Sequence, residues 1–161
     1  YISQKMDEED LLLGGESSGG LKIRGHVNGK DGILAALLAV EMLAKTGKTL
    51  SQLLAEINDQ YGSLHFDFIN ISYAPAERKR LETLLFAEKY VPDFGKEVNQ
   101  VSYMDGVKFY FADETWLSIR FSGTEPILRI FMEARSGEDA QRLKEVVLNE
   151  ERLNLTVRNG V

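Results

Sequence analysis

The sequence contains no cysteine, which excludes disulfide bonds and thiolate metal sites. It also lacks a long hydrophobic run, because the longest apolar stretch, residues 33–40, is far shorter than the about 20 residues that a membrane-spanning helix needs. Basic residues are fewer than acidic ones: the sequence has 19 Lys and Arg residues and 25 Asp and Glu residues, which gives a formal net charge of -6. This charge argues against a nucleic acid as the main ligand, so any anion must be bound by local groups.

The overall composition is that of an ordinary globular protein. The 161 residues are 43% hydrophobic, enough to bury a core in one ordinary domain or in two small units. No signal-peptide pattern opens the chain, and the expected setting is cytoplasmic. The first residue, Tyr1, is not a methionine, which suggests a segment of a longer protein.

The first part of the chain predicts one short strand followed by a glycine-rich loop. Residues 11–13 are apolar and lead directly into residues 14–20, which include four glycines. Residues 26–31 then form a polar connection to the next apolar segment.

Two helices are predicted next. The first begins at Gly32, is capped by Asp31 and ends at Gly47; its strong helix formers are apolar on nearly every side, so it should be buried. The second starts at the capping box that begins with Thr49 and runs to about Tyr61. We place a domain boundary after this helix.

The remainder of the chain mixes strands and helices. The predicted elements are a strand at 66–73, a helix at 76–90, a hairpin of strands 98–104 and 107–111 around Asp105-Gly106, strands at 116–121 and 127–134, a helix from Ser136 to about 149, and a short strand through Leu153, Leu155 and Val157. Because the strands and helices do not alternate strictly, the predicted fold class is α+β.

The connection between the strands at 116–121 and 127–134 is a candidate anion site. It places Ser122, Gly123 and Thr124 between Arg120 and Arg129. Guanidinium groups and hydroxyls donate to phosphate oxygens, and a glycine lets successive backbone N–H groups turn toward one anion. The alternative is a Ser-Gly turn whose hydroxyls bond their own backbone, with both arginines solvated.

The glycine-rich loop at residues 14–20 is a candidate polyol site. The Glu16 carboxylate can accept from two vicinal hydroxyls, and the glycines allow a sugar ring to approach the backbone. A solvated surface loop is the alternative. His26 and Lys30 lie in the polar connection that follows; each could titrate or bind phosphate, although isolated surface residues of these types usually do neither.

Together these segments resemble the signatures of the α-D-phosphohexomutase superfamily, which includes phosphoglucomutases and phosphomannomutases. Gly-Glu-Ser-Ser-Gly at 15–19 resembles the family's Gly-Glu-x-Ser-Gly sugar-binding loop. Arg-Phe-Ser-Gly-Thr-Glu-Pro at 120–126 is similar to its phosphate-binding loop, and residues 26–32 resemble its His-x-x-x-Lys-Asp-Gly segment. The resemblance covers the whole chain.

The resemblance implies a set of site residues. Substrate sugar binding falls to Glu16, Ser18 and Lys30, and substrate phosphate binding to Arg120, Ser122, Gly123, Thr124 and Arg129. Two departures stand out: Gly20 replaces a histidine found in many members, and Ser17 replaces a second glutamate. No general acid or base can therefore be assigned at Gly20, and His26 or Lys30 is the candidate for that role.

The resemblance also implies domain organisation and chemistry. Residues 1–61 would end the α/β domain three, and residues 62–161 would form domain four, with an α+β fold like the TATA-box-binding protein. In the family, a phosphoserine of domain one and a Mg²⁺ of domain two interconvert hexose 1-phosphate and hexose 6-phosphate through a hexose 1,6-bisphosphate.

Neither the phosphoserine motif nor the Asp-rich metal loop is present here, so this chain alone should be inactive and should bind no metal. Its expected partners are the hexose phosphate and domains one and two, with no nucleic acid or membrane. A self-standing sugar-phosphate or anion-binding module is the alternative function. The sequence leaves open the oligomeric state and the choice among glucose, mannose and N-acetylglucosamine substrates.

Overall fold

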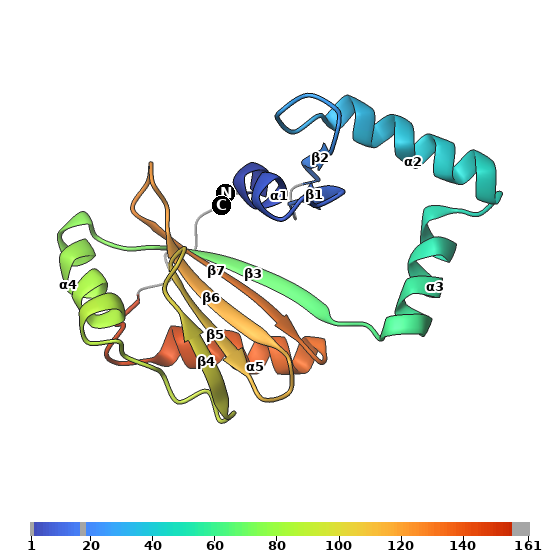
Figure 1. The fold of residues 1–161 in the computed structure, drawn as a ribbon. Coiled ribbons are helices and arrows are strands. Elements are labelled where there is room, and N and C mark those ends of the chain that lie inside the picture. The colour runs from blue at the N-terminus through green and yellow to red at the C-terminus, as the bar shows by residue number, and fades with distance from the viewer. Residues whose placement is uncertain (1, 17–18, 156–161) are drawn as a thin grey trace. The chain divides into compact units, whose positions relative to one another are not determined.

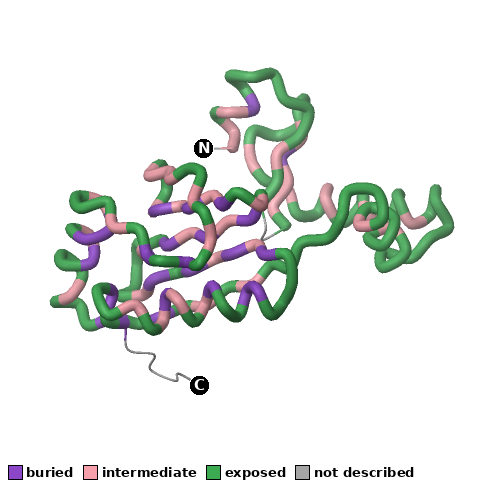
Figure 2. The backbone as a smooth tube through the Cα atoms, turned by 90° about the horizontal axis from the view of Figure 1, so that it is seen from below, coloured by how far each residue is buried: buried purple, intermediate pink, exposed green. Residues whose placement is uncertain are grey.

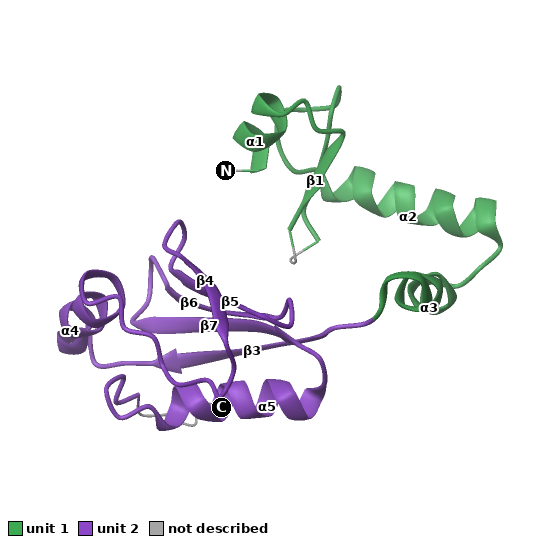
Figure 3. Ribbon diagram, turned by 60° about the horizontal axis from the view of Figure 1, so that its bottom comes forward, with its two compact units in different colours: residues 1–62 green, residues 63–161 purple. Residues whose placement is uncertain are grey.

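The computed structural model describes residues 2–16 and 19–155. The chain divides into two compact units, residues 1–62 and residues 63–161 (Figure 3). Each unit is described separately below. No helix in the described part of the chain combines the length and apolar character needed to span a bilayer.

The described residues of the first unit form three helices and a small hairpin (Figure 1). Its elements are α1 (Ile2–Glu8), β1 (Leu13–Gly15), β2 (Leu21–Ile23), α2 (Gly32–Thr46) and α3 (Leu50–Tyr61). Strands β1 and β2 pair antiparallel. Helix α1, which the sequence did not predict, packs on this hairpin: a Cβ added to Gly14 would lie 2.6 Å from Ile2 Cγ2 and 2.9 Å from Met6 Sδ. Glycine therefore permits the close contact.

Local capping signals define α2 and α3, as the sequence predicted. The Asp31 carboxylate accepts hydrogen bonds from the backbone N–H groups of Ile33 and Leu34 at 2.9 and 3.0 Å. Helix α2 ends at Gly47, which adopts a left-handed φ of 66°. The capping box that opens α3 at Thr49 is complete.

The prediction that α2 is buried is wrong for the described structure. None of its residues is buried, and Ile33 and Leu37 are 77% and 62% exposed. Figure 2 shows both α2 and α3 without buried residues. Helix propensity and caps specify the helix locally, but burial requires a packing partner, and the described residues of the first unit bury none of α2. The strand predicted at residues 11–13 is also displaced, since β1 begins only at Leu13.

The second unit is a five-stranded antiparallel sheet of order β3-β7-β6-β5-β4 (Figure 1). Its strands are β3 (His65–Ser72), β4 (Val98–Ser102), β5 (Val107–Phe111), β6 (Trp116–Phe121) and β7 (Ile127–Ala134). Its helices are the 3₁₀ turn η1 (Pro75–Glu77), α4 (Arg78–Glu82), the π-helical η2 (Thr83–Ala87) and α5 (Gly137–Asn149). The mixture of helices with an antiparallel sheet confirms the α+β class.

The core lies on one face of this sheet. Alternate residues of β5, β6 and β7 are buried, and side chains from α4, η2 and α5 complete the same cluster (Figure 2). On β6, Leu117 and Ile119 are fully buried, whereas Arg120 is exposed. Residues 116–121 alternate apolar and polar side chains, as expected of a strand with one buried face, and the predicted strand is confirmed.

The helix predicted at 76–90 is confirmed as continuous helical structure over residues 75–87, although it consists of η1, α4 and η2 and ends three residues early. The strand predicted through Leu153 and Leu155 is wrong for its described residues: Leu153 lies in a turn and Leu155 is buried outside any strand, while Val157 lies outside the described residues. The Arg80 guanidinium donates to the Leu153 carbonyl at 2.9 Å, so a side chain replaces a neighbouring strand as its partner.

Candidate functional site

The connection from β6 to β7 is a short turn whose base is held by backbone hydrogen bonds. The Ser122 N–H donates to the Ile127 carbonyl at 2.8 Å, which closes the turn just beyond the paired strands. The Tyr73 N–H donates to the Pro126 carbonyl at 3.0 Å and ties the turn to the end of β3. Gly123 and Thr124 at the tip are exposed. Their backbone and hydroxyl groups can therefore reach a ligand.

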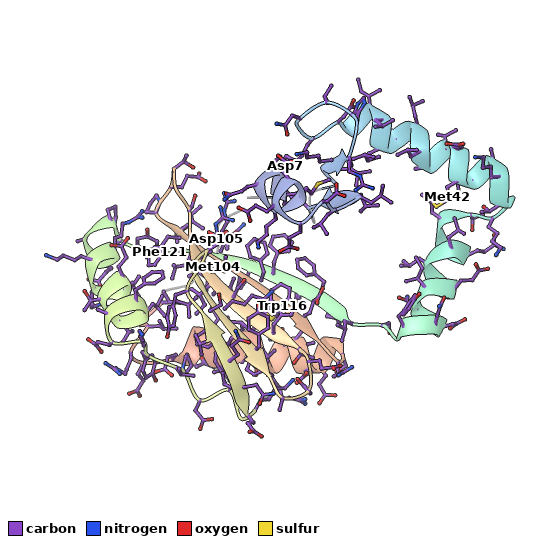
Figure 4. The ribbon with its side chains drawn as sticks, viewed as in Figure 1. Asp7, Met42, Met104, Asp105, Trp116 and Phe121 are labelled. Carbon is purple, nitrogen blue, oxygen red and sulfur yellow. The ribbon has the colours of Figure 1, made fainter. Side chains whose placement is uncertain are left out.

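Arg120 and Arg129 flank this turn and lie directly opposite each other in the β6–β7 register. Both are exposed. Directly opposed residues of an antiparallel pair project to the same face of the sheet, so the two guanidinium groups share one face. Arg120 Nη1 forms an ion pair with Asp105 Oδ2 at 3.1 Å. Asp105 can be located in Figure 4 where β4 and β5 are joined.

Ser122 differs from the rest of the turn because it is buried, with 4% of its surface exposed. Its Oγ has no hydrogen-bond partner among the described residues. A buried hydroxyl without a partner loses its hydration without compensation. In this conformation the hydroxyl does not face the solvent, and it would have to turn outward to contact a phosphate.

In the first unit, Glu16 of the β1–β2 loop pairs with Lys30 of the connection between β2 and α2. Lys30 Nζ donates to Glu16 Oε2 at 2.7 Å. A Cβ on Gly20 would lie 2.6 Å from Lys30 Cδ, so the lysine stem packs directly against Gly20. Ser18, the other predicted sugar ligand, lies outside the described residues.

His26 pairs with the helix cap. Its Nε2 lies 2.8 Å from Asp31 Oδ2. Hydrogen bonds from His26 and from the backbone N–H groups of Leu34 and Ile33 lower the pKa of the Asp31 carboxyl below its usual value. His26 and Asp31 thus form a hydrogen-bonded pair at the start of α2.

Sequence reasoning missed Lys22, a buried charge on β2. Lys22 Nζ lies 2.7 Å from Asn28 Oδ1 and 3.3 Å from Asp7 Oδ1. These bonds tie α1 and the connection before α2 to the hairpin. In the sequence, Lys22 is only a charged residue between Leu21 and Ile23. This pattern is equally typical of an exposed side chain on a strand, so it does not predict that Lys22 is buried. Asp105, which pairs with Arg120, was recognised only as a turn residue.

Each unit thus has its own group of polar side chains that could bind a ligand. The second unit offers two guanidiniums beside an exposed turn, which suits a dianion such as phosphate. The first unit offers a carboxylate and an ammonium group on a glycine-rich hairpin, which suits hydroxyl groups. Among the described residues, no group of three or more His, Cys, Asp or Glu side chains is arranged to bind a metal ion.

Comparison with known proteins identifies the family of this two-unit α+β chain. Residues 1–61 match the family described as phosphoglucomutase/phosphomannomutase, alpha/beta/alpha domain III. Residues 76–150 match phosphoglucomutase/phosphomannomutase, C-terminal domain. The chain therefore belongs to the phosphoglucomutase/phosphomannomutase family, and it corresponds to these two parts of it.

Individual relatives agree with this assignment. A phosphoglucomutase/phosphomannomutase of Thermococcus kodakarensis is 33% identical over 90% of this chain and 29% of the relative. A phosphoglucosamine mutase of Herminiimonas arsenicoxydans is 34% identical over 89% of this chain and 28% of the relative. The chain thus spans less than a third of the length of these relatives.

A solved structure shares the fold. The phosphoglucomutase/phosphomannomutase family protein of Burkholderia thailandensis superposes with a TM-score of 0.66 over 95% of this chain and 30% of that protein, at 19% identity.

Proposed function

We propose that this chain is the substrate-binding C-terminal part of a mutase that interconverts hexose 1-phosphate and hexose 6-phosphate through a hexose bisphosphate. The observation that carries the proposal is the pair Arg120 and Arg129, which lie opposite each other beside the exposed β6–β7 turn. Membership of the phosphoglucomutase/phosphomannomutase family gives the reaction class.

The second unit, as part of the C-terminal domain that we place at residues 62–161, binds the phosphate that does not react. Arg120 and Arg129 supply the positive charge, while Gly123 and Thr124 supply donors from the exposed tip of the turn. Ser122 adds its hydroxyl once it turns outward. Such a clamp accelerates phosphoryl transfer by positioning the substrate and balancing its charge.

The first unit, as the end of domain III at residues 1–61, binds the sugar. Glu16 accepts hydrogen bonds from ring hydroxyls, together with Ser18. Lys30 reaches the same hydroxyls, because its ammonium group already lies 2.7 Å from the Glu16 carboxylate. Lys30 or His26 moves the proton of the reacting hydroxyl. Lys30 is the better placed relative to Glu16, whereas His26 pairs with Asp31.

The chemistry of transfer requires groups beyond these. Mg²⁺ in a phosphohexomutase supports phosphoryl transfer, but the donor set here does not fit it, since the described residues include no metal-binding cluster. We therefore assign the metal and the phosphoserine to other domains of the full-length protein. This chain by itself binds substrate without converting it.

The test is a mutase assay of the full-length protein with glucose 1-phosphate, mannose 1-phosphate and glucosamine 1-phosphate, beside the 161-residue chain alone. We expect turnover of at least one substrate by the full-length protein and none by the chain. Absence of turnover with every substrate, while the chain still binds hexose phosphates, would instead support a binding module without catalysis.

A further inference from the structure

Arg120 has a carboxylate partner that the proposed phosphate clamp does not use. Asp105 lies in the β4–β5 connection, and its Oδ2 is 3.1 Å from Arg120 Nη1. Both side chains are largely exposed, at 71% for Asp105 and 51% for Arg120. The ion pair therefore reaches the solvent, where a phosphate would also approach.

The backbone holds the two residues together. Gly106, next to Asp105, has a φ of 76°, and a Cβ on it would overlap the Ile119 carbonyl oxygen and lie 3.0 Å from Arg120 Cα. Only glycine permits so close an approach in this conformation. The turn that contains Asp105 therefore packs closely against the backbone of β6 at Arg120. The fold thus brings Asp105 and Arg120 within reach of each other, and the ion pair itself forms between two exposed side chains.

The same geometry makes Asp105 a competitor of phosphate. An exposed ion pair is weak and is screened by salt, so a dianion with two or more acceptor oxygens can replace one carboxylate on a guanidinium. A carboxylate that remains beside the bound dianion repels it. Asp105 thus occupies Arg120 in the empty site and opposes the retention of phosphate in the filled one.

We propose that Asp105 is a positioning residue that competes with the substrate phosphate for Arg120 and thereby promotes phosphate release. This assignment rests on the proposed function. Easier release of phosphate is useful in a mutase, because the intermediate has to leave the clamp and bind again in a second orientation.

The experiment compares substrate affinity in full-length variants. The substrate is the hexose 1-phosphate that the wild type converts, and its Kd is measured by calorimetry at low ionic strength. We expect Asp105→Asn to lower the Kd about threefold, the size of effect that an exposed ion pair gives, while kcat does not rise. Asp105→Glu restores the charge and should return the Kd toward the wild-type value.

Two controls separate this effect from net charge and from structural damage. Glu114→Gln removes another exposed negative charge from the β5–β6 turn, where Glu114 forms an ion pair with Arg135 at 3.6 Å, and should leave the Kd unchanged. In an Arg120→Ala background, Asp105→Asn should have no effect, because the group for which it competes is gone. Structural damage would not tighten binding.

The outcomes distinguish the two proposals. If Arg120→Ala weakens binding but Asp105→Asn leaves the Kd unchanged or raises it, the competition proposal is wrong and the phosphate clamp stands. If Arg120→Ala leaves the Kd unchanged, the clamp itself is wrong. An equal tightening in Glu114→Gln would assign the effect to net charge and overturn the role of Asp105.

Discussion

Arg120 of β6 and Arg129 of β7 are register partners, so two positive side chains project side by side from the same face of the sheet. Like charges directly opposite each other destabilise a sheet pair. The Asp105 carboxylate, 3.1 Å from Arg120, offsets only part of this repulsion. A dianion bound at the β6–β7 turn would neutralise both guanidinium groups, and this is the physical basis of the proposed clamp.

Ser122→Ala separates stability from binding. Because the buried hydroxyl has no partner among the described residues, its removal should leave the free energy of unfolding unchanged or raise it by up to about 1 kcal/mol. If the hydroxyl turns outward to the phosphate, the same variant should bind hexose phosphate about 5- to 10-fold more weakly. Urea denaturation and calorimetry measure the two effects. A large loss of stability would show instead that the hydroxyl has an internal partner.

Glu16→Gln tests the sugar loop. The change keeps the shape but removes the charge that accepts hydroxyl hydrogen bonds and pairs with Lys30. We expect kcat/KM for the hexose 1-phosphate to fall about 10- to 100-fold, as for the loss of a charged hydrogen bond. Glu8→Gln, which removes an exposed carboxylate of α1 located 3.7 Å from Lys5, is the matched control. Full activity of Glu16→Gln would show that the loop connects β1 and β2 without binding the sugar.

The cluster around Lys96 should set part of the acid stability of the second unit. Lys96 Nζ lies 2.8 Å from Asp113 Oδ2 and 2.6 Å from Asp139 Oδ2. Burial raises the pKa of Asp113, but hydrogen bonds from Lys96 and Thr115 outweigh it and lower the pKa from 3.8 to about 2. The pKa of Asp139 is lowered as well: burial again raises it, and the bonds from Lys96 and Arg142 prevail.

A lowered folded-state pKa means that the folded protein binds fewer protons than the unfolded chain. The stabilisation is therefore complete above about pH 4 and is lost as the pH falls toward 2. Lys96→Met should cost about 1–3 kcal/mol at neutral pH, because it removes one of the two cations that pair with the buried Asp139 carboxylate and leaves only Arg142. It should also flatten the fall in stability between pH 4 and pH 2. Chemical denaturation at several pH values tests this, and an unchanged pH profile in Lys96→Met would contradict it.

Much of the fold follows from local sequence signals. Asp31 and Thr49 define the starts of α2 and α3 through hydrogen bonds to neighbouring backbone groups, and such short-range bonds are readable from the sequence. The alternation in β6 and β7 fixed the bounds of both strands, because one face of the sheet is buried.

Features that depend on contacts between distant residues were not predictable. The exposure of α2 depends on what packs against it, and the burial of the Ser122 hydroxyl depends on how β6 and β7 close their turn. The pair of Asp105 with Arg120 joins two hairpins of the sheet, whose register no local pattern specifies. The sequence thus indicated which residues form the candidate site, but not which of them face the solvent.

The central claim is that Arg120 holds the substrate phosphate, and the most direct measurement is the KM of Arg120→Ala in the full-length protein. The control is Arg135→Ala, which removes an equally exposed arginine at the other end of β7. We predict that the KM for the hexose 1-phosphate rises about 10- to 100-fold in Arg120→Ala, the cost of a lost charge-assisted hydrogen bond, and changes little in Arg135→Ala. An unchanged KM in Arg120→Ala, or an equal rise in both variants, would contradict the account.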